Sequence, residues 1–93
     1  LSDPNFEVFS GACVLLAQDI RNLFSHLLEG IIEAPSFLSD YSHVLRQLLS
    51  VSDYCSQMTR PVYASKYDPK LYHVNLYIGK SILKNVVTLT EMI

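Results

Sequence analysis

The feature that most constrains the fold is a row of apolar residues near the N-terminus, spaced alternately three and four positions apart. This spacing places side chains on one face of an α-helix, which completes a turn about every 3.6 residues. The row consists of Phe6, Phe9, Cys13, Leu16, Ile20, Leu23 and Leu27. Asp3 is a good N-cap, Pro4 suits the first helical position, and Gly30 supplies a stop. We therefore predict a helix over residues 4–29.

Two further segments show the same periodicity. The row in the second segment contains Leu38, Tyr41, Leu45, Leu48, Ser52 and Cys55. Pro61 forces this helix to end shortly before it, and Asp68-Pro69 repeats the start signal of the first helix. The pattern predicts helices over residues 36–58 and 69–92. No persistent apolar–polar alternation indicates a strand, so we expect an all-α fold, a three-helix up-down-up bundle.

Composition indicates one domain with more apolar surface than it can bury alone. The chain has 93 residues, of which 49% are hydrophobic and 17% charged. The charged share lies below the roughly 25% that is usual for soluble domains. The chain begins at Leu1 rather than methionine and ends inside an apolar pattern. We therefore expect residues 1–93 to form a single helical domain that belongs to a larger protein.

Charge, hydropathy and cysteine content indicate which partners and which cellular compartment to expect. The net charge is −2, which makes nucleic acid an unlikely partner of the whole domain. No run of residues approaches the roughly 18 apolar positions of a membrane span, so we expect no membrane-spanning helix. Cys13 and Cys55 form no disulfide framework, although one disulfide between helices stays open. An intracellular protein, cytoplasmic or nuclear, is the expectation.

The sequence contains no motif for catalysis or for a cofactor. His26, His43 and His73 fall on the polar sides of three different helices and lack metal-ligand spacing. We expect Cys13 to be buried and Cys55, at the edge of its row, to be partly accessible. We therefore predict no enzyme activity, no metal site and no cofactor.

The third helix carries an excess of apolar residues. With Ile78 as the centre, its predicted core-facing arc contains Leu71, Val74, Ile78, Ile82, Val86, Leu89 and Met92. A second row lies outside that arc and contains Tyr72, Leu76, Leu83 and Val87, with Gly79 beside it. The first helix has only scattered extras at Val8, Val14 and Leu15.

We predict that the second row and Gly79 bind another helix, either from a partner protein or from a second copy. Such a helix would complete the bundle as a fourth member, and a glycine inside a helix is tolerated where another backbone comes close. The alternative explanation is that a fourth helix of the parent protein, or the connection 59–68, covers the row.

Two other functions stay open. The segment 60–84 interleaves basic and aromatic residues, as weak single-stranded nucleic-acid binding would need. Within it, the loop residues available for contacts are Arg60, Tyr63, Lys66 and Tyr67. Alternatively, the bundle could enclose an apolar ligand or lipid between its helices.

Overall fold

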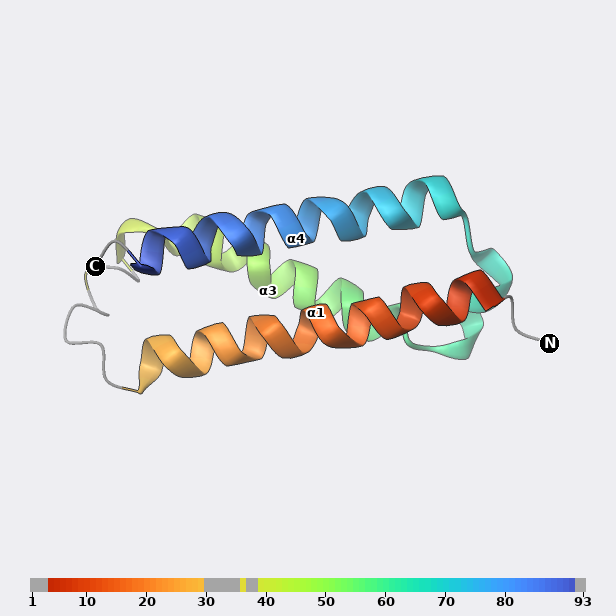
Figure 1. The fold of residues 1–93 in the computed structure, drawn as a ribbon, viewed down its shortest axis with the longest axis horizontal. Helices are drawn as coiled ribbons and strands as arrows, with labels where there is room; N and C mark the ends of the chain where they lie inside the picture. Colours follow the sequence, from red (N-terminus) through yellow and green to blue (C-terminus); the bar gives the residue numbers. More distant parts are fainter. Residues whose placement is uncertain (1–3, 30–35, 37–38, 92–93) are drawn as a thin grey trace.

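The computed structural model describes residues 4–29, 36 and 39–91, and within them it contains three long α-helices, one short 3₁₀-helix and no strand (Figure 1). The elements in chain order are α1 (Pro4–Leu28), α3 (Ser42–Gln57), the 3₁₀-helix η1 (Pro61–Lys66) and α4 (Pro69–Glu91). The helices pack against one another along their lengths. The predicted all-α bundle is confirmed.

The boundaries of two helices agree with prediction to within one residue, whereas the second helix begins later than expected. Tyr41 is a turn residue with φ −114° and ψ 22°, far from α-helical values, so α3 begins only at Ser42. Residues 39–40 before this break are helical. The predicted helix over 36–58 is therefore wrong as one continuous element. Asp3, Gly30 and Met92 lie outside the described residues.

The start and stop signals around the second connection act as predicted. Asp68 Oδ1 accepts a hydrogen bond of 3.0 Å from the backbone N–H of Lys70, which caps the first turn of α4. At the end of α3, the N–H of Met58 donates to the carbonyl of Tyr54 at 3.0 Å. Pro61 then opens η1, an element that the sequence analysis did not foresee.

The helices α1 and α4 run in the same direction, with α3 antiparallel to both (Figure 1). The rings of Phe9 and Tyr72 are 5.4 Å apart between centroids. A Cβ atom at Gly79 would lie 3.3 Å from Cδ2 of Leu16. Each of these two pairs is separated by 63 positions in the chain. The two helices therefore keep one register over at least two turns.

Aromatic side chains fill the end of the core where α1 and α4 begin. Phe9 is fully buried, and its ring lies 5.4 to 6.2 Å from those of Phe6, Tyr67, Tyr72 and His73. Tyr67 follows η1, so the second connection contributes to this end of the core. The hydroxyl of Tyr67 also forms a hydrogen bond of 2.5 Å with Nε2 of His73.

Candidate docking groove

The structure turns α4 so that part of the predicted outer row lies in the core. Tyr72 is 8% exposed and Leu76 6%, and Gly79 is buried between them and Val86. The assignment of Tyr72, Leu76 and Gly79 to an outer face that binds a partner is therefore wrong. The centre of the buried face is near Gly79 instead of Ile78, a rotation of about 100° for one residue.

Close packing at Gly79 explains this rotation. A Cβ atom there would lie 2.7 Å from Cγ1 of Val51 on α3, in addition to its contact with Leu16 on α1. Larger side chains at this point would hold the helices apart. The atoms nearest to Gly79 are side-chain atoms of Val51 and Leu16, so the predicted close approach of another backbone is wrong, and the packing partners are α3 and α1 of the same chain.

Hydrogen bonding fixes the other side of the buried face. Asn75 donates from Nδ2 to the hydroxyl of Tyr54 at 3.4 Å, so this side of α4 lies against α3. Burial raises the pKa of Tyr54 above its ordinary value, and the bond from Asn75 opposes that effect. The exposed apolar side chains on the opposite side of α4 form a convex stripe, which consists of Leu71, Val74 and Ile78 from the predicted core-facing arc, with Tyr77 beside them.

The last two residues of the predicted row, Leu83 and Val87, line a groove between α4 and α1. Leu83 is partly buried and Val87 is exposed. The groove encloses about 610 Å³. Its α1 side consists of Ala12, Leu15, Leu16 and Asp19. Its α4 side consists of Lys80, Leu83, Lys84, Val87, Thr88 and Glu91. The groove is thus an apolar channel built by two parallel helices.

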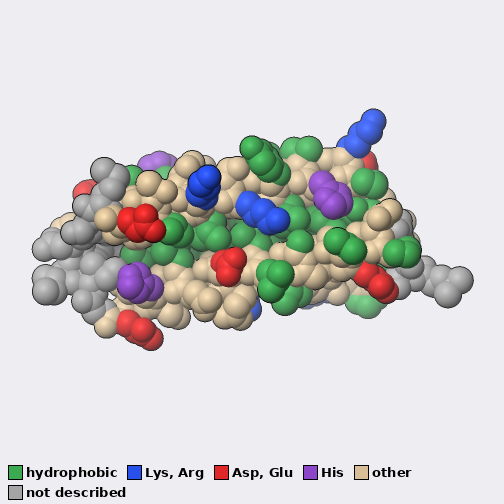
Figure 2. Space-filling model, in the orientation of Figure 1, with side chains coloured by type: hydrophobic (Ala, Val, Ile, Leu, Met, Phe, Trp, Pro, Cys, Tyr) green, Lys and Arg blue, Asp and Glu red, His purple; other side chains and the backbone are tan. Residues whose placement is uncertain are grey.

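Opposite charges line the two edges of this groove. Figure 2 shows hydrophobic side chains in a band between the two helices, with acidic side chains over α1 and basic ones over α4, and with one further acidic side chain near the C-terminal end of α4. The basic groups that line its middle are Lys80 and Lys84, and the acidic group on α1 is Asp19. Glu91 adds an acidic group where the α4 edge ends. The sequence analysis missed the contribution of α1. The available signal was the spacing of Val8, Leu15 and Asp19, which share one side of that helix.

The predicted loop contacts separate into two kinds. Arg60 and Lys66 are exposed, whereas Tyr63 and Tyr67 are partly buried against the hydrophobic core. With Tyr72 buried as well, Tyr77 is the tyrosine of the described segment 60–84 that is mostly exposed. The stacking platform expected for nucleic acid is therefore largely used in packing.

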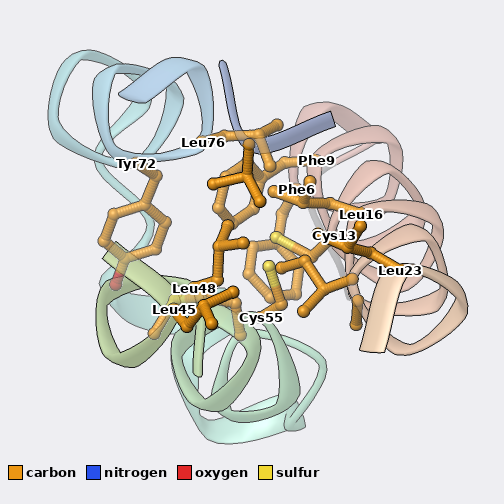
Figure 3. Close-up of a cluster of buried hydrophobic side chains, with 14 of the residues drawn as sticks. Phe6, Phe9, Cys13, Leu16, Leu23, Leu45, Leu48, Cys55, Tyr72 and Leu76 are labelled. Atoms are coloured by element: carbon orange, nitrogen blue, oxygen red, sulfur yellow. The ribbon is translucent and has the colours of Figure 1, made fainter. Parts of the chain in front are cut away.

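The two cysteines lie side by side in the middle of the core. Figure 3 shows their sulfur atoms pointing toward one another between α1 and α3, and the side chains of Cys13 and Cys55 are hydrogen-bonded. Both thiols are free and fully buried, so the expected partial accessibility of Cys55 is wrong. The hydrogen bond with Cys55, followed by burial, raises the pKa of Cys13. A protonated, inaccessible thiol is a poor nucleophile.

The remaining candidate groups are dispersed over the surface. His26, His43 and His73 are exposed on three different helices, as predicted. Among the described residues, no group of three or more His, Cys, Asp or Glu side chains could hold a metal ion. In the same part of the chain, none of the helices has the length and hydropathy needed to cross a bilayer.

Comparison with known proteins finds a short likeness to a large kinase. A stretch of 57 residues, 61% of this chain, is 35% identical to the serine/threonine-protein kinase ATM of Arabidopsis thaliana. The chain spans 2% of the length of that kinase. No protein-family model matches the chain, and no solved structure matches it.

Proposed function

We propose that this chain is a non-catalytic interaction module that docks another α-helix in the groove between α1 and α4. The observation that carries the proposal is the groove itself, an apolar channel with Asp19 on one edge and Lys80, Lys84 and, at its end, Glu91 on the other. A helix laid along two parallel helices completes a four-helix bundle, an arrangement that buries side chains from every member.

Burial of apolar surface supplies the driving force. Leu15 and Val87 are exposed on opposite sides of the groove. Fully burying such a side chain is worth roughly 1.5–3 kcal/mol. A docked helix that covers both residues gains this energy and offsets part of the cost of association with it. The convex stripe around Val74 lies on a single helix, so it cannot enclose a partner in the same way.

The charges on the groove edges define the chemistry of the docked helix. Its apolar face needs acidic side chains along the edge that meets Lys80 and Lys84, and basic side chains along the edge that meets Asp19. Such complementary charges favour the correct partner and its orientation more than they add affinity.

The non-catalytic character and the intracellular setting belong to the same proposal. Its support is that both thiols are free and buried and that the three exposed histidines lie on three different helices. The likeness to a stretch of serine/threonine-protein kinase ATM fits a helical segment used within a large protein. The 57 matched residues are 2% of that kinase and are near the lower limit of domain size, so the likeness covers at most one small domain of it.

Photo-crosslinking in cells tests the proposal. In three separate variants, a photoreactive phenylalanine derivative replaces Leu15 in the groove, Val74 on the convex stripe, or Leu49, an exposed residue of α3. We expect protein adducts of higher mass from position 15 and none from positions 74 and 49. The substitution Val87→Asp in the same chain should remove them. Adducts from position 74 alone would move the docking surface to the convex stripe and contradict the proposal.

A further inference from the structure

The charges on the two edges of the groove lie at the same height along the bundle. The pairs Phe9–Tyr72 and Leu16–Gly79 set the register of α1 against α4, with 63 positions between partners. By this register, Asp19 is level with Ile82. It therefore lies midway between Lys80 and Lys84, about 3 Å along the axis from the level of each.

This placement makes the face complementary to itself under one symmetry operation. A two-fold axis parallel to the helices lays α4 of one copy over α1 of the other and preserves every residue's height. Asp19 of each copy then meets Lys80 and Lys84 of the partner subunit. An axis across the helices instead lays α4 over α4 with the heights reversed. When that axis passes at the level of Ile82, these lysines oppose lysines and repel one another.

We infer that the occupant of the groove is a second copy of this chain, related by a two-fold axis parallel to α1 and α4. The inference rests on the proposed function, because it names the partner of the same groove. In this dimer, α1 and α4 of both copies form a central four-helix bundle, with α3 of each copy on the outside. Leu15, Leu83 and Val87 of both copies fill its centre.

The size of the face and its symmetry agree with this dimer. The protein measures 49 × 21 × 17 Å along its principal axes. One long face is thus large enough for the roughly 800 Å² per partner that a standard interface buries. A two-fold interface uses the same patch on both copies, as a groove with opposite charges on its two edges allows.

Charge reversal on one edge at a time tests the inference. The variants are Asp19→Lys and the double variant Lys80→Glu/Lys84→Glu, each measured by light scattering over a range of concentrations. We expect the wild-type chain to be a dimer in equilibrium with monomer. Each variant alone should dimerise at least about tenfold more weakly, because like charges then face each other. Arg46→Glu, an exposed charge on α3, is the matched control and should leave dimerisation unchanged.

Mixing the two variants gives the decisive measurement. At one contact of the mixed dimer, the Asp19→Lys substitution of one copy meets the Lys80→Glu/Lys84→Glu substitutions of the other, so opposite charges face each other again. At the second contact, the native Asp19 meets the native lysines. An equimolar mixture should therefore regain wild-type dimerisation, with circular dichroism verifying that each variant is folded. A wild-type monomer at all concentrations, or a mixture no better than its components, would overturn the inference.

The crosslinking experiment separates this failure from failure of the proposed function. Adducts of position 15 with twice the mass of the chain support the second copy. Adducts with a different protein, together with a monomeric wild-type chain, overturn the second copy and leave helix docking in place. If position 15 gives no adduct and the chain is a monomer, both proposals fall.

Discussion

A Cβ atom at Gly79 would lie 2.7 Å from Cγ1 of Val51, so α4 meets α3 at a position that accepts no side chain. Gly79→Ala gains about 1 kcal/mol of helix propensity but overpacks the contact, which typically costs about 1–3 kcal/mol. Val51 is β-branched and cannot easily move aside. We expect Gly79→Ala to lower the free energy of unfolding, measured in urea, by about 1 kcal/mol. The same substitution should cost less in a chain that already carries Val51→Ala.

Gly11→Ala is the matched control for that substitution. Gly11 is also inside a helix, but a Cβ atom there would meet nothing within 4 Å. We expect this variant to be more stable than wild type by about 0.5–1 kcal/mol. Equal effects at the two glycines would contradict the close packing at Gly79.

The corrected orientation of α4 predicts opposite outcomes for two neighbouring substitutions. Leu76 is buried, and an unpaired carboxylate in its place should cost several kcal/mol of the roughly 5–15 kcal/mol that stabilise a domain. Val74 is 54% exposed, so Val74→Asp should change stability by only about 0.5 kcal/mol. Circular dichroism during thermal unfolding checks both. A Leu76→Asp variant that stays folded would contradict the observed orientation of α4 and favour the one predicted from the sequence.

The aromatic end of the core depends most on Phe9, which contacts rings from α1, α4 and the connection between α3 and α4. We expect Phe9→Ala to lower the free energy of unfolding by about 3–5 kcal/mol. The adjacent Val8 is 72% exposed, whereas Phe9 is 0% exposed. Val8→Ala should therefore leave the urea midpoint within the error of wild type, and a comparable loss at both positions would refute this account of the core.

Alkaline pH should destabilise the protein through Cys13. Its thiol has a raised pKa in the folded state, so it keeps its proton at a pH where the unfolded thiol, with a pKa of about 8.5, releases one. The hydrogen bond with Cys13 lowers the pKa of Cys55 in the folded state, so that thiol adds stability as the pH rises toward this value. Above it, the free energy of unfolding should fall by up to about 1.4 kcal/mol per pH unit for the Cys13 proton. Denaturant unfolding between pH 7 and 9.5 measures the slope, and Cys13→Ala should make it shallower. An unchanged slope in that variant would contradict the assignment.

The helical periods were readable from the sequence, but the rotation of α4 was not. In α1, the apolar residues outside the main row are few and scattered, and each member of the predicted row from Phe6 to Leu27 is buried. In α4, apolar residues surround most of the circumference, so the period alone fixes the core-facing direction poorly. Tertiary contacts decided it, with Tyr72 joining the aromatic cluster and Gly79 contacting Val51.

The groove was only half predictable for a related reason. Leu83 and Val87 belonged to the predicted row, whereas Leu15 was one of several scattered extras on α1. Which extras line a groove depends on the angle at which two helices face each other, and no periodicity within one helix contains that information. The later start of α3 was equally hidden, since Tyr41 fits the apolar row and yet adopts a turn conformation.

The parallel course of α1 and α4 has a consequence for how the chain folds. Antiparallel α1 and α3 are neighbours in sequence, so their contacts close a short loop, whereas contacts of α1 with α4 join positions 63 apart. Loop-closure entropy makes the distant contacts costlier to form first. The antiparallel pair α3 and α4 is equally local, with Tyr54 and Asn75 only 21 positions apart. We therefore expect the contacts of α3 with α1 and with α4 to form first, and those between α1 and α4 to complete the bundle.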